Sequence, residues 1–201
     1  GVPAELNTHY SLSDVDVTAG YILDLNVAWD LVQRNGLVAR VMAGYKQNGW
    51  TWEDRIRYMV YIDDYFIPDY SYAGDNGINY EQEFRIPYLG ASADWMWNQF
   101  TFSGYLTWSA IVEATDWDEH VLRDTHYKET FTGGDMLGFG LEARYDFADG
   151  FFKGAFATAS LDYQAVDLIV GDMEFYDAST GERGGGKNAA GIENEYLVIS
   201  L

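Results

Sequence analysis

The chain contains no cysteine, only three prolines and few basic residues. Without cysteine it forms no disulfide framework and no thiolate metal site, but the redox compartment stays open, because many envelope proteins also lack cysteine. Its 12 lysines and arginines stand against 32 aspartates and glutamates, which gives a formal net charge of −20 at pH 7. Such a surface repels a polyanion, so we exclude a nucleic-acid-binding protein.

The sequence also lacks long apolar runs. No stretch approaches ~18 uninterrupted apolar residues, which excludes a transmembrane helix. No basic segment followed by an apolar segment is found after Gly1, so we expect that a signal peptide was removed or that the N-terminal part is missing. With 48% hydrophobic and 17% aromatic residues, the chain is too apolar for a disordered acidic tail.

What the sequence does contain is strand periodicity. In 100–112 the even positions are apolar or small and the odd positions are mostly hydroxylated, which is typical of a strand with two unlike faces. The same alternation predicts strands at 137–147, 21–29, 37–45 and 80–88, and two further strands at about 151–176 and 188–201. We therefore predict about seven long strands and no helix, an all-β protein.

Two all-β architectures fit this pattern, a soluble barrel or sandwich and an outer-membrane barrel with its apolar face outward. Strands of about 10 to 13 residues suit a tilted membrane crossing, and aromatic residues crowd the strand ends. Short turns at Asn35-Gly36, Asn98-Gln99 and Asp149-Gly150 alternate with long polar segments near 53–79, 116–130 and 176–188. These features favour an antiparallel up-and-down transmembrane barrel, with a soluble β-domain as the alternative.

The most concentrated candidate site is the acidic segment 113–120. In an extended chain Asp116, Asp118 and His120 share one face, and an Asp two residues from a His can orient the imidazole for use as a general base. These even positions continue the face that we predict to meet lipid up to Val112. A β-bulge between about Val112 and Asp116 would turn them inward, or they stand above the membrane. The alternative is an ordinary solvated loop cluster.

The other polar features of the sequence are weaker candidates for a functional site. A metal site is weakly supported, since three hard ligands come without a second histidine, and we expect no metal. His9 and His126 have no comparable setting, and Gly184-Gly185-Gly186-Lys187 lacks the spacing of a phosphate-binding loop, so we interpret it as a flexible loop.

Four motifs together resemble one known family, the omptins, outer-membrane endopeptidases of Gram-negative bacteria. The motifs are Met42-Ala43-Gly44-Tyr45, Ile86-Pro87-Tyr88-Leu89-Gly90, Asp118-Glu119-His120 and Ala190-Gly191-Ile192-Glu193-Asn194. The resemblance runs over nearly the whole chain, and the order of the motifs is more specific than any one of them.

This resemblance implies a ten-stranded barrel that extends above the membrane, with an active-site groove at its extracellular rim. The family uses an Asp-His pair that faces an Asp-Asp pair, with a water between them as the nucleophile. The Asp-His pair corresponds to Asp118 and His120, and Asp116 corresponds to an acidic residue of the pocket for a basic substrate side chain. The resemblance implies cationic peptide or protein substrates, no cofactor, and lipopolysaccharide as activating lipid and partner.

The sequence departs from the family in its first part. Gly1–Ala19 carries no motif like the D-W-M-D loop that holds the second acidic pair, and Asp94-Trp95-Met96-Trp97 lies at the wrong end of its strands. We expect one partial barrel domain over 1–201, with 1–19 a loop or incomplete strand and 176–188 an extracellular loop, and we expect it to be inactive alone. Arg85, interpreted as inward, and Lys153 are the only lipid-contact candidates, so no lipid site is assigned. The alternative function is a non-enzymatic outer-membrane barrel, an adhesin or structural protein.

Overall fold

The computed structural model describes residues 9–61 and 67–201, and seven long strands make up most of them. The strands are β1 (His9–Arg34), β2 (Leu37–Tyr61), β4 (Asn76–Trp97), β5 (Phe100–His120), β6 (Thr125–Asp146), β7 (Phe156–Asp177) and β8 (Arg183–Ser200), with the two-residue β3 (Pro68–Asp69) and the short 3-10 helix η2 (Val121–Arg123) between them. No helix in these ranges is long and apolar enough to cross a membrane.

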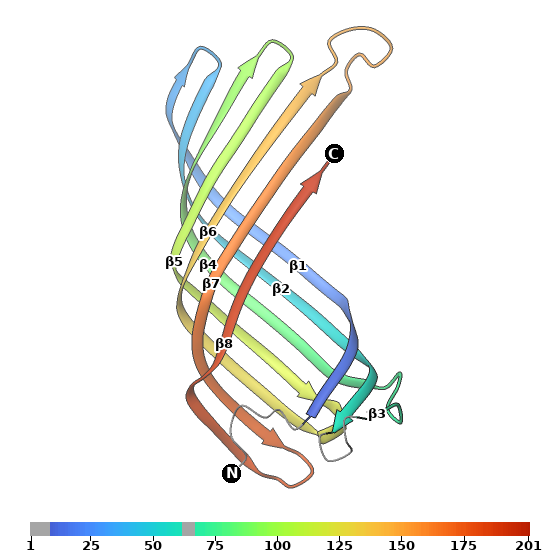
Figure 1. The fold of residues 1–201 in the computed structure, drawn as a ribbon. Coiled ribbons are helices and arrows are strands. Elements are labelled where there is room, and N and C mark those ends of the chain that lie inside the picture. Colours follow the sequence, from blue (N-terminus) through green and yellow to red (C-terminus); the bar gives the residue numbers. More distant parts are fainter. Residues whose placement is uncertain (1–8, 62–66) are drawn as a thin grey trace.

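All strands belong to one antiparallel sheet. Each long strand pairs with the next in the order β1-β2-β4-β5-β6-β7-β8, and β3 adds to β2. Within the described residues β1 and β8 each have one long neighbour, so the sheet is a strongly curved wall that is not closed (Figure 1). The predicted all-β, up-and-down barrel architecture is confirmed, with this seam left open.

The two ends of the wall differ. At the turn end, uppermost in Figure 1, tight connections include Asn35-Gly36, whose φ angles of 51° and 78° suit a type I′ hairpin. At the opposite end, which we call the rim, lie η2 and the connections after β2 and β7. The strands have 18 to 26 residues, more than the predicted 10 to 13. Since about 9 to 11 tilted residues cross a bilayer, they are long enough to extend well beyond one.

These long strands correct several predicted boundaries. The segment 116–130 is a hairpin whose only break is at 121–124, and the connection after β7 is 178–182 rather than 176–188. β1 begins at His9, so 9–19 of the segment predicted as a loop or incomplete strand is strand, and residues 1–8 lie outside the described ranges. β7 begins at Phe156, because Phe151–Gly154 forms a turn. At the rim, polar residues continue the backbone hydrogen-bond ladder of the sheet, whereas composition alone predicted loops there.

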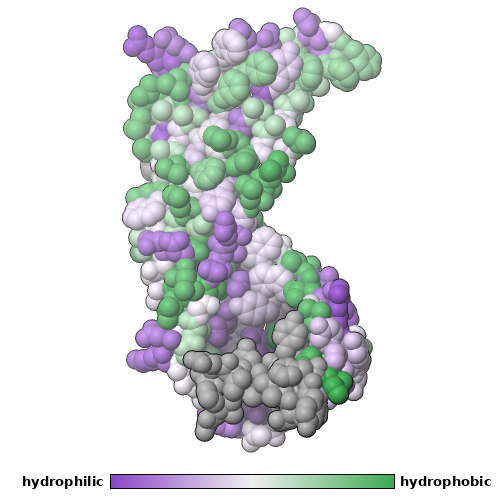
Figure 2. All heavy atoms as spheres, viewed as in Figure 1, coloured by the Kyte–Doolittle hydropathy of each residue, from purple (hydrophilic) through white to green (hydrophobic). Residues whose placement is uncertain are grey.

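In the half of the wall next to the turn end, apolar side chains point outward as predicted. Phe102, Leu106 and Trp108 on β5 are exposed, whereas Thr107 and Ser109 between them are buried. Green hydrophobic side chains accordingly gather over the upper half of the molecule in Figure 2. This is the inside-out arrangement of a barrel that meets lipid.

A row of β-bulges reverses this alternation at mid-height. Relative to both neighbours, β5 holds one extra residue between Ser109 and Val112, so that Ala110 and Ile111 both point outward. β6 has Thr132 and Gly133 outward in succession at the same level, and β7 has the pair Asp167-Leu168. Because side chains alternate along a strand, one extra residue moves all later side chains to the other face. The predicted bulge therefore exists, a few residues before the predicted position.

Beyond the bulges the interior is apolar. Val112, predicted to face lipid, is completely buried, and Phe84 and Ile86 on β4 are buried with it. The core cluster comprises Phe84, Ile86, Tyr88, Val112, Ala114, Phe131, Met136, Val166, Ile169 and Ile192. Arg85 therefore points outward, not inward as predicted, and forms an ion pair with Glu83.

Candidate active site

The bulge in β5 decides where the candidate residues point. With the extra residue in place, Asp116, Asp118 and His120 lie on the same inward face as buried Val112 and Ala114. The three predicted site residues are thus brought together at the rim end of β5, with β4 on one side and β6 on the other.

Asp118 and His120 form a close pair. His120 Nε2 lies 3.1 Å from Asp118 Oδ2, and both side chains are about three-quarters covered. The ring of His120 also packs at a tilt on Tyr127 of β6, with ring centroids 5.0 Å apart. One imidazole nitrogen is thus fixed by a carboxylate, which is the arrangement that orients a general base. The other Asp118 oxygen, Oδ1, is buried and has no hydrogen-bond partner.

Asp116 is fully buried beneath this pair. Tyr80 of β4 donates its hydroxyl to Asp116 Oδ2 at 2.6 Å, and Gln82 Nε2 donates to the Tyr80 hydroxyl at 2.9 Å. Asp116 Oδ1 has no hydrogen-bond partner. Burial, together with the charge of Asp118, raises the pKa of Asp116 above its ordinary value, although the Tyr80 hydrogen bond lowers it. A buried carboxylate with one free oxygen is suited to receive a cationic group.

A further acid, Glu129 on β6, was missed by the sequence analysis. It is the cross-strand partner of Asp116, and burial and the charges of Asp116 and Asp118 raise the pKa of Glu129 to about 7. The hairpin that joins β5 and β6 pairs His120 with Thr125, and counting back from that pair brings Glu129 opposite Asp116. The register could have been found from the sequence had 116–130 been interpreted as a hairpin and not as a loop.

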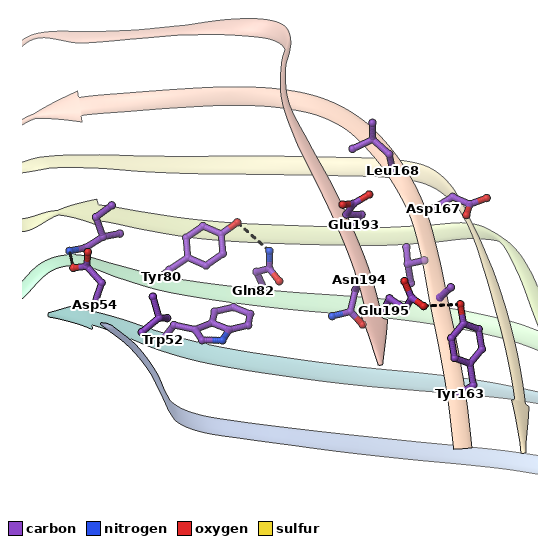
Figure 3. A pocket seen from close by; sticks show the side chains of 14 residues that line it. Trp52, Asp54, Tyr80, Gln82, Tyr163, Asp167, Leu168, Glu193, Asn194 and Glu195 are labelled. Atoms are coloured by element: carbon purple, nitrogen blue, oxygen red, sulfur yellow. Dashed lines mark hydrogen bonds between the residues drawn. The ribbon is translucent and has the colours of Figure 1, made fainter. Parts of the chain in front are cut away.

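A cavity of about 840 Å³ opens beside these groups, between the two edges of the sheet. Figure 3 shows Trp52, Tyr80 and Gln82 from β2 and β4, and Glu193 and Glu195 from β8, among its lining residues. Asp54 and Asp167 also line it. The lining combines aromatic rings with carboxylates, and within 9–61 and 67–201 it contains no lysine or arginine. Such a cavity suits a cationic, partly apolar ligand such as a basic peptide.

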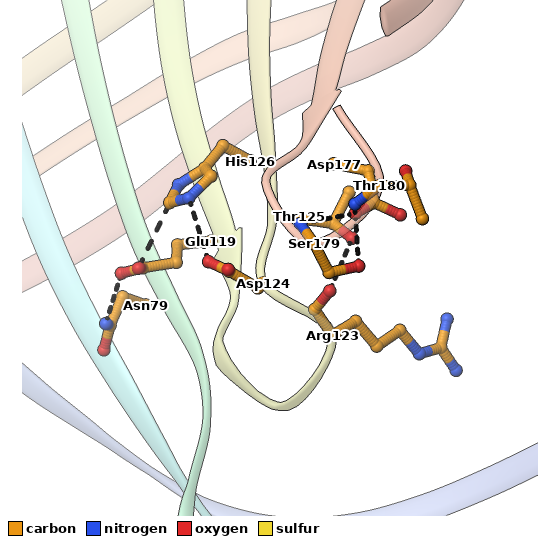
Figure 4. A network of polar contacts seen from close by, with 9 residues as sticks. All are labelled: Asn79, Glu119, Arg123, Asp124, Thr125, His126, Asp177, Ser179 and Thr180. Atoms are coloured by element: carbon orange, nitrogen blue, oxygen red, sulfur yellow. Dashed lines mark hydrogen bonds and ion pairs between the residues drawn. The ribbon is translucent and has the colours of Figure 1, made fainter. Parts of the chain in front are cut away.

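His126 has an acidic setting that was not predicted. Its Nδ1 lies 4.0 Å from Glu119 Oε1 and its Nε2 lies 3.6 Å from Asp124 Oδ1, and Asn79 donates to Glu119 (Figure 4). The His126 side chain is about half exposed. His126 therefore belongs to an outer rim network, separate from the inward pair of Asp118 and His120. The side chain of His9 lies outside the described part of the structure.

The structure also shows where two other sequence motifs lie, the segment 94–97 and the glycine run 184–186. Trp95, Met96 and Trp97 are exposed at the turn end, opposite to His120, and Asp94 forms an ion pair with Arg40. The glycine run at 184–186 lies in β8 rather than in a flexible loop. A Cβ at Gly184 would meet the Phe175 ring at 2.4 Å, and one at Gly185 would meet the Met173 carbonyl oxygen at 2.4 Å. Glycine is required there because the neighbouring strand approaches closely.

The curved all-β wall with an acidic, histidine-containing rim defines a class of outer-membrane-type barrel, and comparison with known proteins names the family. Residues 4–201 match the Omptin family, so the chain belongs to it.

Several curated relatives are similar in sequence. The chain is 27% identical over 198 residues to the plasminogen activator of Yersinia pestis, covering 98% of this chain and 62% of that protein. It is 25% identical over 183 residues to the outer membrane protease OmpP of Escherichia coli K12, covering 88% of this chain and 56% of that protein. The chain thus spans about three-fifths of the length of these relatives.

A solved structure shares the fold. The crystal structure of the outer membrane protease OmpT from Escherichia coli superposes with a TM-score of 0.81 at 23% identity, covering 96% of this chain and 65% of that chain.

Proposed function

We propose that the protein is an endopeptidase of the outer membrane of a Gram-negative bacterium that hydrolyses peptide bonds next to basic residues. Membership of the omptin family and relatives named as outer-membrane proteases support this class. The observation that carries the proposal is the inward pair His120 and Asp118, 3.1 Å apart, beside the buried carboxyl group of Asp116.

In the proposed mechanism His120 takes a proton from a water molecule as that water attacks the scissile carbonyl carbon. The imidazolium then gives this proton to the amide nitrogen as the C–N bond breaks and the amine leaves. Asp118 orients the imidazole and stabilises its positive charge once the proton has moved. Asp116 binds the lysine or arginine side chain of the substrate, because a desolvated carboxylate pairs strongly with a cation. The reaction is thus of the aspartic type, with a histidine as its partner.

The family's mechanism also needs a carboxyl pair on the far side of the water. Gly1–Ala19 has no motif of that kind, so we infer that these 201 residues are inactive by themselves and that activity belongs to the complete gene product. On the family resemblance alone, we propose lipopolysaccharide as the activating lipid. Cleavage of a dibasic peptide by the isolated chain in micelles with lipopolysaccharide would contradict the inferred inactivity.

The test uses the complete gene product in outer-membrane preparations and a fluorogenic peptide with an Arg-Arg bond. His120→Ala should lower kcat by about 10²- to 10⁴-fold, because it removes the general base. His126→Ala is the matched control, since this half-exposed histidine lies outside the inward pair, and it should cleave at the wild-type rate. Full activity in the His120→Ala variant would contradict the proposed mechanism. Absence of cleavage by the wild-type protein would favour a non-enzymatic adhesin or structural barrel.

A further inference from the structure

Glu129, the acid opposite Asp116, has no part in the mechanism above, and its position indicates a further role. Glu129 pairs with Asp116 across β5 and β6, and it pairs with Met173 across β6 and β7. The titratable groups around it on the inward side are Asp116 and Asp118 of β5, Tyr80 of β4 and Tyr127 of its own strand. Lys128, next to it in sequence, points outward.

The Asp116 side chain shows that this group of acids is open to a ligand. Asp116 is fully buried, and among the described residues its Oδ1 atom has no hydrogen-bond partner, although its Oδ2 atom accepts from Tyr80. A buried carboxylate oxygen without a partner carries a free-energy penalty that a bound cation would remove. Glu129, on the neighbouring strand β6, lies on the same inward face as Asp116.

We propose that Glu129 is a specificity-determining residue, whose carboxyl group joins that of Asp116 in binding the basic side chain of the substrate and releases its proton to solvent when that side chain enters. The inference rests on the proposed function and extends it to a residue outside the Asp116, Asp118 and His120 set. In the empty site below pH 7, Glu129 holds a proton while the Tyr80 hydroxyl stabilises ionised Asp116, which leaves one negative charge. In the occupied site both acids are ionised against one guanidinium or ammonium group.

This exchange makes binding depend on pH. The pKa of Glu129 is raised to about 7 by burial and by the neighbouring carboxylates, so below pH 7 the entering cation must displace a proton. A cation that binds the ionised form favours deprotonation, so affinity for a basic side chain rises with pH. For one displaced proton, the Kd should fall about tenfold from pH 6 to pH 8.

The experiment measures binding without cleavage. In the His120→Ala background, which prevents cleavage, a fluorescein-labelled peptide with one arginine is compared by fluorescence anisotropy with the same peptide carrying citrulline instead. The arginine peptide should bind more tightly at pH 8 than at pH 6 by about tenfold, and the neutral citrulline peptide should show no such change. Adding Glu129→Gln should flatten the pH profile and weaken arginine binding at pH 8 by about tenfold.

Glu119→Gln is the matched control, because it makes the same charge change at the same rim on a side chain that is 43% exposed, and it should keep the wild-type profile. Calorimetry in two buffers needs no Glu129 variant and should record release of about half a proton at pH 7 on binding.

An unchanged pH profile in Glu129→Gln, or no proton release, would overturn the role of Glu129 and leave the basic specificity intact. Equal binding of the arginine and citrulline peptides would overturn the proposed function together with this inference.

Discussion

At the scale of single residues, the site depends on carboxylates that the fold withdraws from water. Asp116 has Tyr80 as its hydrogen-bond donor, and Tyr80 is itself held by Gln82. A hydroxyl that donates to a buried carboxylate stabilises its ionised form, which is the form that binds a cation. Under the proposed function, Tyr80 acts on substrate binding through Asp116.

Tyr80→Phe should raise the KM for an arginine peptide about tenfold at pH 7, because loss of a hydrogen bond to a charged group costs about 1.5 kcal/mol or more. The change in kcat should be smaller, since His120 and Asp118 are untouched. Steady-state kinetics on the complete gene product would measure both constants, with Tyr145→Phe at the turn end as control. A fall in kcat at constant KM would instead place Tyr80 in the chemical step.

At the scale of elements, the row of bulges in β5, β6 and β7 links two kinds of barrel wall. On the turn-end side the apolar residues face outward, and on the rim side they form an internal core. Without the extra residue in β5, the pair Asp118 and His120 would lie on the outer face. The bulge is therefore part of the site, although it lies several residues away.

Deletion of Ile111 should test this directly. Removing one residue from the bulge shifts the side chains beyond it to the opposite face, so activity should fall by at least about 10³-fold even if the barrel assembles. Assembly can be followed by heat-dependent electrophoretic migration of the membrane-embedded protein. Ile111→Ala keeps the residue count and should retain cleavage, since Ile111 is exposed. Activity in the deletion variant would contradict the account of the bulge.

The elements also show what sequence periodicity could and could not predict. The alternation in 100–110 correctly indicated a strand with an outward apolar face, since period two is a local property, but Val112 faces the core. The extent of the strands was wrong, because acidic residues at the rim continue the ladder where composition predicts loops. The predicted inward side of Arg85 was wrong as well, because Phe84 and Ile86 face an internal core that only the assembled sheet creates. Spacing and resemblance predicted Asp116, Asp118 and His120, which lie together on the inward face, whereas the place of Glu129 opposite Asp116 required the hairpin register.

At the scale of the whole molecule, polar contacts cross the interior and connect distant strands. In a second cavity of about 730 Å³ toward the turn end, Lys46 Nζ of β2 lies 3.1 Å from Gln164 Oε1 of β7, 3.4 Å from the Tyr196 hydroxyl of β8 and 3.6 Å from Asp24 Oδ2 of β1. One buried cation thus ties β1 and β2 to β7 and β8 across the open seam.

Lys46→Met should lower the free energy of unfolding by about 2 kcal/mol, less than for a fully buried pair because Asp24 remains 35% exposed. The double variant Lys46→Met with Asp24→Asn should recover part of this loss, because no unpaired carboxylate is left inside. Urea unfolding in detergent micelles would measure both, with Lys153→Met in the exposed turn as control. An unchanged unfolding midpoint in the single variant would show that the interior contacts do not stabilise the wall.

The net negative charge is also a property of the whole molecule. The formal net charge of −20 creates a field that attracts cations, and Asp116 and Glu129 lie opposite each other on the inward side of the rim. Under the proposed function, this charge brings the substrate, the buried acids select its side chain, and the Asp118 and His120 pair acts on the bond beside it.

The most direct test of this account is a double-mutant cycle on kcat of the complete gene product, with Asp118→Asn, His120→Ala and the double variant. If the two residues act as one general-base unit, each single variant should lose about 10²- to 10⁴-fold in kcat, and the double variant should lose no more than the worse single variant. Losses that multiply in the double variant, or a His120→Ala variant that cleaves at the wild-type rate, would contradict the claim.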